Sequence, residues 1–169
     1  MIQEGDIVSL DAGVIYKGYH SDAARTHAVG EVSEEAKKLI QVTKESFFEG
    51  IKFAKAGNHL FDISGAIGRY AEERGYGVVR DLCGHGIGTA LHEAPEIPNY
   101  EVGRKGVRLR PGMTLAIEPM INIGTHEVDW LDDDWTVVTR DGSLSAHYEN
   151  TILITEGEPR ILSLTCENE

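Results

Sequence analysis

The stretch DIVSLDAGVIYKGYHSDAARTHAV, residues 6–29, alternates apolar and polar side chains on both sides of Lys17 and Gly18. This alternation predicts two antiparallel strands joined by a tight turn. Asp11 and Asp22 fall on the two strands, directly opposite each other if the turn is centred before Lys17, and diagonal if Lys17 and Gly18 form a two-residue turn. In either register the two carboxylates share a face, whereas a one-residue slip would separate them.

This carboxylate pair has two interpretations. Two ionised carboxylates in cross-strand contact repel each other, so a buried pair needs either a proton or a cation between them. Exposed aspartate is common, however, and on this pair alone two solvated side chains near a turn are the favoured interpretation. The pair therefore needs support from elsewhere in the sequence.

Two amphipathic helices are expected after the hairpin. Ser33 is a suitable N-cap, apolar residues recur at helical spacing as far as Ala54, and Gly57 is expected to end this helix. A second helix is expected over residues 60–71 and stops at Gly75. The helices separate the hairpin from the strand-like segments that follow.

The later segments are strand-like and are punctuated by Gly and Pro. They comprise residues 76–82, 114–123, 135–139, 145–155 and 160–164. A hairpin, two helices and then a group of strands predict an α+β fold with helices on one sheet face. No repeat or linker divides the chain, so residues 1–169 are expected to form one domain.

Composition and charge limit the possible functions. The 169 residues are 41% hydrophobic and 26% charged, as in ordinary globular domains. The net charge of −12 without a basic stripe argues against direct nucleic-acid binding, and no apolar run is long enough to cross a membrane. A cytoplasmic protein is the simplest expectation. Cys83 and Cys166 show no CxxC spacing, so metal ligands are expected to be oxygen and nitrogen.

His85 lies in CGHGIG, residues 83–88. We expect the flanking glycines to adopt positive φ angles and to leave the imidazole open to a cavity. A hydrogen-bonded loop histidine is the alternative. A phosphate-binding glycine loop is less favoured because the segment opens no helix and no Lys follows.

Two more carboxylates occupy unusual places. Glu118 interrupts an apolar strand directly before Pro119, and Glu149 leads into another apolar strand. Either could lie on a polar surface, but a buried and unpaired carboxylate would be expensive. Together with Asp11, Asp22 and His85, they are best explained by one shared site that contains two cations.

Four segments resemble type I methionine aminopeptidase, and in the same order. They are LDAGVIYKGYHSDAARTHAVG, CGHGIGTALHEAP, RPGMTLAIEPM and SAHYENTILIT, within a resemblance that covers residues 5–164. The resemblance implies the pita-bread fold, with helices on a curved antiparallel sheet. It also implies removal of the N-terminal initiator methionine from peptides and nascent proteins.

The resemblance implies a role for each metal ligand. Asp11 matches the ligand of one ion, His85 and Glu118 match ligands of the other, and Asp22 and Glu149 match the bridging carboxylates. The implied cofactors are two divalent ions, and this donor set accepts Co, Mn, Fe or Zn.

Three further roles follow from the same resemblance. His92 matches the histidine that hydrogen-bonds the scissile peptide unit, Glu118 is the implied general base, and Trp135 matches an aromatic residue near the methionine pocket. The implied partners are the N-termini of peptides and of nascent chains, the latter at the ribosome. A prolidase or aminopeptidase P-like Xaa-Pro peptidase and a non-catalytic binding module of the same fold remain alternatives.

The family carries a segment before the part that resembles this sequence, and no counterpart is found here. We therefore expect an apolar patch over the outer faces of residues 8–14 and 115–121, and self-association through it. We also expect metal binding to survive better than catalysis, with selectivity for methionine most affected.

Overall fold

The structure is a computed structural model that describes residues 1–164. Its first two strands, β1 (Ile7–Tyr16) and β2 (Tyr19–Ala28), form the expected hairpin. Lys17 and Gly18 make a two-residue turn with φ angles of 50° and 83°, as the right-handed strand twist favours. Asp22 pairs with Gly13, so Asp11 and Asp22 are diagonal neighbours. The second of the two expected registers is confirmed.

Both helices form, but the first is shorter than expected. Helix α1 (Glu34–Ile51) begins after Ser33, whose side chain accepts a hydrogen bond from the backbone N–H of Ala36. It ends before Lys52 rather than at Gly57. The Gly57 N–H donates to the carbonyl of Leu109 instead, so a tertiary contact replaces the last expected turn.

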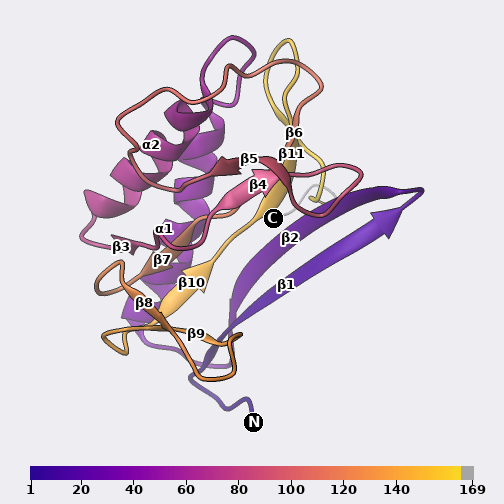
Figure 1. Ribbon diagram of the computed structural model, residues 1–169. Coiled ribbons are helices and arrows are strands. Elements are labelled where there is room, and N and C mark those ends of the chain that lie inside the picture. The colour runs from indigo at the N-terminus through magenta and orange to yellow at the C-terminus, as the bar shows by residue number, and fades with distance from the viewer. Residues whose placement is uncertain (165–169) are drawn as a thin grey trace.

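Helix α2 (Leu60–Glu72) agrees with the expectation and is followed by Gly75 in a left-handed conformation. Helices α1 and α2 pack against each other on one face of the strands (Figure 1). Phe47, Ile63 and Ile67 from the helices are fully buried with Leu115 and Ile152 from the strands. The expected arrangement of helices on one sheet face is confirmed.

The remaining strands are short. They are β3 (Gly77–Val78), β4 (Gly84–Gly86), β5 (Glu93–Ile97), β6 (Thr114–Ile117), β7 (Met120–Asn122), β8 (Val128–Trp130), β9 (Val137–Thr139), β10 (Ser145–His147), β11 (Asn150–Leu153) and β12 (Arg160–Ile161). Antiparallel pairing gives the orders β12-β11-β6-β4-β5, β10-β7-β3 and β8-β9, besides the β1-β2 hairpin.

Two segments expected to be single strands are each divided between two sheets. Residues 114–123 break at Glu118 and Pro119, between β6 and β7, and residues 145–155 break at Tyr148 and Glu149, between β10 and β11. Because β6 pairs with β11 and β7 with β10, the two breaks lie side by side. The Tyr148 N–H donates to the Pro119 carbonyl across them at 3.2 Å.

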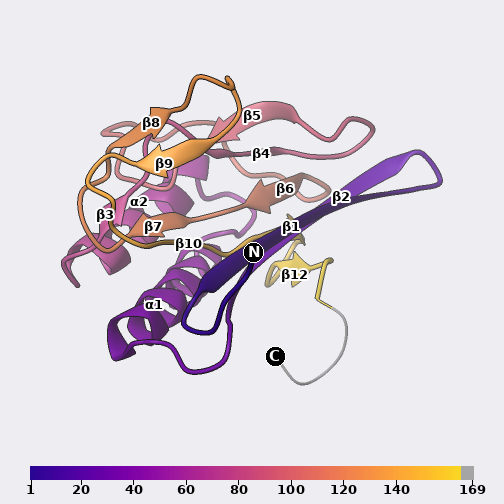
Figure 2. The same ribbon diagram turned by 90° about the horizontal axis from the view of Figure 1, so that it is seen from below.

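The tip of the hairpin extends beyond the rest of the molecule in both views (Figures 1 and 2). Tyr16 and Tyr19 at this tip are 70% and 65% exposed, and Leu10 and Val14 on β1 are also exposed. The expected apolar patch is present here. The expectation for residues 115–121 is wrong, because their aliphatic side chains are buried in the core.

Among the described residues, no helix has the length and apolar character needed to cross a membrane.

Candidate metal centre

Strand β2 is fixed against β11, and this places Asp22 beside the strand breaks. The Asp22 N–H donates to Thr151 Oγ1 at 2.8 Å, and the Thr151 hydroxyl donates to the Asp22 carbonyl at 3.0 Å. The Glu149 N–H donates to the Ala24 carbonyl at 2.9 Å. These contacts bring together carboxylates that are 127 positions apart in the chain, at 22 and 149.

His85 reaches the same place from β4, which lies between β5 and β6. It is buried on a strand, and neither Gly84 nor Gly86 has a positive φ, so the expected loop with positive-φ glycines is wrong, although the ring does line a cavity as expected. Its glycines serve close strand packing: a Cβ at Gly84 would lie 2.4 Å from the Ala116 carbonyl oxygen, and one at Gly86 would lie 2.3 Å from that of Ala94.

The orientation of the His85 ring is fixed by its own strand. Nδ1 lies 2.9 Å from the Gly86 carbonyl oxygen, which can only accept a hydrogen bond, so Nδ1–H is the donor. In the neutral ring this leaves the Nε2 lone pair free to bind a cation.

The strand breaks, β2 and β4 together build one cluster of oxygen and nitrogen atoms. One such atom from each of Asp22, His85 and Glu149 lies within 4.8 Å of the other two. Glu118 lies between two imidazoles: its Oε1 is 3.4 Å from His85 Nε2, and its Oε2 is 3.7 Å from His147 Nε2. Four of the five expected ligands are therefore in one cluster with these separations.

The fifth expected ligand, Asp11, lines the same cavity and acts on the cluster through its charge. Burial, and then the charges of Asp11 and Asp22, raise the pKa of Glu118 to about 8. Burial and the other three carboxylates raise the pKa of Glu149 to about 9. Burial also lowers the pKa of His85, which keeps its ring neutral. Four carboxyl groups in this space repel one another when they are ionised, and a bound cation would offset that repulsion.

The residues present fit divalent metal ions. Glu149 Oε1 and His147 Nε2 are buried and have no hydrogen-bond partner among residues 1–164. A buried polar atom without a partner is costly, and a cation would satisfy the carboxylate oxygen. Carboxylate oxygens with imidazole nitrogen suit Mn, Fe, Co or Zn.

The cavity over this cluster has a volume of about 640 Å³ and is also lined by His92 and Trp135. The His92 and His85 rings are 4.3 Å apart between centroids. His92 is exposed just before β5, and Trp135 is 86% exposed at the cavity rim. All seven expected site residues thus line one cavity.

Two residues near the cluster were not among the expected site residues. His147 lines the cavity at the end of β10, and burial lowers its pKa. Side chains two residues apart on a strand point to the same face, so the position of His147 two residues before Glu149 was a signal that it could share the site. Arg25 donates hydrogen bonds to the Glu149 carbonyl and to Asn150 Oδ1, and its guanidinium lies 4.1 Å from the Tyr148 ring centroid. It fastens β2 to the break between β10 and β11.

A pita-bread fold with a buried cluster of carboxylates and imidazole defines a metallopeptidase. Residues 1–156 match the model of Metallopeptidase family M24, and the chain belongs to that family. Members of this class use divalent metal. The resemblance seen in the four sequence segments is therefore confirmed at the level of the family.

Relatives and solved structures agree with this assignment. The chain is 59% identical over 167 residues to methionine aminopeptidase from Clostridium acetobutylicum, covering 99% of this chain and 66% of the relative. It is 51% identical to methionine aminopeptidase 1 from Bacillus subtilis, covering 92% and 63%. The structure matches methionine aminopeptidase from Thermotoga maritima with a TM-score of 0.92 and 51% identity, covering 95% and 65%. The chain thus spans slightly less than two thirds of these relatives.

A prolidase from Pyrococcus horikoshii has the same fold with lower similarity. Its TM-score is 0.77 and its identity is 29%, with 97% of this chain and 42% of that one covered.

The metal-free protein should lose stability as pH rises from about 7 to about 8.5. The pKa of Glu118 is about 8 in the folded chain against an ordinary value of 4.5, so the folded state holds more protons than the unfolded state in this window. Proton loss therefore favours unfolding. Below this window His85 and His147 oppose the effect, since burial lowers their pKa values. With chelator present, we expect Tm to fall by at least about 3 °C.

The matched control is Glu118→Gln, which removes one of the two buried carboxyl groups with raised pKa values, Glu118 and Glu149, and should reduce the dependence. Excess Mn²⁺ should flatten it in the unaltered protein as well. A Tm that rises across the window in chelator would contradict the assignment of buried, protonated carboxyls.

Proposed function

We propose that this chain is the catalytic part of a methionine aminopeptidase, which removes N-terminal methionine from peptides and nascent proteins. The observation that carries the proposal is the joint presence of Asp11, Asp22, His85, Glu118 and Glu149 around one cavity. The 59% identity to an enzyme named methionine aminopeptidase supports the substrate class.

The cluster would hold two divalent ions, which supply Lewis-acid activation of water near neutral pH. Asp11 would bind one ion, His85 and Glu118 the other, and Asp22 and Glu149 both. The central burial of Asp22 and Glu149 supports their bridging role, since both are under 8% exposed.

Two side chains of the cavity are suited to proton transfer and hydrogen bonding. A Glu118 carboxylate in a buried site is suited to accept the proton that an attacking water loses. His92, beside His85, would donate from a ring nitrogen to the carbonyl oxygen of the scissile bond, where negative charge develops. These two groups act on opposite partners of the reaction, the nucleophile and the carbonyl.

The first residue of the substrate would occupy the side of the cavity that Trp135 and Met120 line. Both are largely apolar, and the flexible Met120 side chain can adapt to an unbranched thioether side chain. Trp135 is largely exposed, so its wall gives limited discrimination between side chains of similar size.

The Xaa-Pro peptidases are the second candidate, because a prolidase shares the fold at 29% identity. The comparison that separates them is hydrolysis of Met-Ala-Ser, Leu-Ala-Ser and Met-Pro-Ser by protein loaded with Mn²⁺. We expect cleavage of Met-Ala-Ser, with weak preference over Leu-Ala-Ser. Cleavage confined to Met-Pro-Ser would favour the hypothesis of an Xaa-Pro peptidase. Metal binding without any cleavage would favour a binding module.

The proposed activity sets the partners and location of the chain. Its substrates would be free N-termini, met on nascent chains at the ribosome in the cytoplasm. The exposed α-amino group of such a chain is the feature that an aminopeptidase recognises.

Self-association through β1 is the expected consequence of the exposed hairpin. Among the described strands β1 pairs only with β2, and Leu10, Val14 and Tyr16 on it are at least 59% exposed. A free strand edge with apolar side chains favours pairing with a second copy. Sedimentation should therefore show a dimer at micromolar concentration, and Leu10→Lys should return it to a monomer. A monomeric unaltered chain would contradict this.

A further inference from the structure

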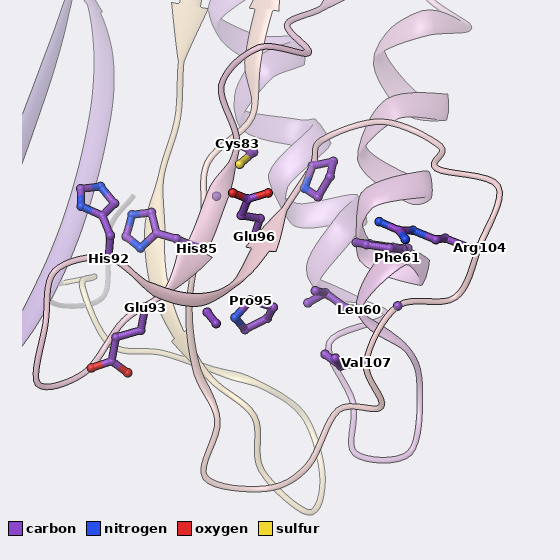
Figure 3. Close-up of a pocket in the computed structure, with 14 residues that line it drawn as sticks. Leu60, Phe61, Cys83, His85, His92, Glu93, Pro95, Glu96, Arg104 and Val107 are labelled. Carbon is purple, nitrogen blue, oxygen red and sulfur yellow. The ribbon is translucent and has the colours of Figure 1, made fainter.

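A second and larger cavity adjoins the metal centre. Its volume is about 830 Å³, and it shares Cys83, His85 and His92 with the first cavity. Figure 3 shows His85 and His92 at one end and Phe61, Arg104 and Val107 at the other. We call this cavity the β5 groove. A ligand held at His92 can therefore continue into it without leaving the protein surface.

The groove follows strand β5, which is the last strand of the order β12-β11-β6-β4-β5. Among the described residues β5 pairs only with β4, so its other edge is available to an extended chain. Pro95 has no N–H, so this edge offers an incomplete ladder. Side-chain contacts rather than a full set of backbone hydrogen bonds would therefore hold the ligand.

The walls of the groove are largely apolar. Leu60 and Phe61 from the start of α2 face it together with Pro95, Pro98 and Val107. Arg104 lies 5.4 Å from the Phe61 ring centroid and brings one cation to the far end. Glu93 also lines the groove, but it accepts hydrogen bonds from Thr89 and Ala90.

An apolar cavity of this size holds a ligand of several residues. Each residue of an extended substrate spans about 3.3 Å. A chain that leaves His92 along the groove would pass His85 and β5 before it reaches Val107. The groove thus has the position that the part of a peptide after the cleaved bond would need.

We propose that the β5 groove binds the peptide chain that follows the scissile bond, in an extended conformation, with apolar side chains against Leu60, Phe61 and Val107. This proposal rests on the proposed aminopeptidase function and adds a substrate preference to it. Peptides with apolar residues after the third position should bind more tightly than those that end at the second.

The test is a cysteine footprint that needs no turnover. Two ligands are used, Met-Ala and Met-Ala-Ser-Val-Leu, each with the scissile amide replaced by a reduced CH₂–NH link. Protein carrying Val107→Cys is loaded with Mn²⁺, and the alkylation rate of each thiol is measured by peptide mapping. Val107 is 46% exposed, so the new thiol is accessible and the core is undisturbed. Cys83 reports on the end of the groove near the metal centre.

The longer ligand, at about ten times its Kd, should slow alkylation at both positions about tenfold. The shorter ligand should protect Cys83 alone. Leu162→Cys is the matched control: it is 44% exposed, lies outside both cavities and should be unaffected. Val107→Glu should weaken the longer ligand about tenfold and leave the shorter one unchanged.

Each other outcome overturns the proposal and is distinguishable. Protection of Cys83 by both ligands, with none at position 107, would place the downstream chain elsewhere and leave the aminopeptidase function standing. Protection of position 107 by the shorter ligand would place the N-terminal residue in the groove. Protection at neither position would count against both the groove and the proposed function.

Discussion

Replacing Asp22 with alanine is expected to remove divalent metal from the protein, from about two equivalents per chain to almost none. Asp22 is 7% exposed, and its carboxylate lies within 4.8 Å of ligand atoms on both His85 and Glu149. Asp22 is proposed to bind both ions. Without its carboxylate there is less negative charge between the two cations, and they repel each other more strongly. Metal analysis of the purified variant after dialysis against Mn²⁺ measures the effect.

The matched control for this variant is Asp132→Ala, at an exposed position in the loop between β8 and β9. It should retain full stoichiometry. Asp22→Asn tests charge separately from size, since it keeps the shape and removes the negative charge. Thermal melting in chelator shows whether each variant folds. A folded Asp22→Ala variant with undiminished metal would show that Asp22 is not a shared ligand.

Replacing His92 with alanine is expected to lower turnover of Met-Ala-Ser by roughly two to three orders of magnitude while metal content stays the same. The imidazole lies beside His85 on the wall of the metal cavity, yet it is exposed and outside the cluster formed by Asp22, His85 and Glu149. Loss of a donor to the developing oxyanion slows the chemical step, so kcat should fall more than KM changes.

His27→Ala, on the exposed end of β2, is the control and should keep full activity. His92→Gln should recover part of the loss because its amide N–H can still donate. Loss of metal from His92→Ala would mean that His92 is a ligand. Unchanged kcat with intact metal would mean that it does not contact the reacting carbonyl.

The hairpin was predictable because its signals are local. Alternation of side chains, and a Lys-Gly pair able to adopt positive φ, determine both the strands and the two permitted registers. The choice between the registers agrees with the turn itself: Lys17 and Gly18 are its two central residues. The Ser33 cap and the helical spacing of apolar residues likewise predicted the positions of α1 and α2, though not the C-terminal end of α1.

The strand breaks at Glu118 and Glu149 could not be predicted from either segment alone. Residues 114–123 and 145–155 each read as one apolar strand, and only their mutual pairing shows that both cross between sheets at the same level. The contact of His147 with Glu118 likewise exists only across this paired crossing, although its place two residues before Glu149 was a local signal that side-chain alternation offered.

The helices, the hairpin and the chemical types of the expected ligands could be predicted from local patterns, because these depend on side-chain period, caps and the cost of burying charge. The tertiary structure was needed to show that the glycines beside His85 allow neighbouring strands to approach closely and do not form an exposed loop. It also decided that Asp22 meets Glu149 through the contacts of Thr151 with β2. Such contacts join residues more than a hundred positions apart in the chain, so no local sequence pattern can predict that they are close in space.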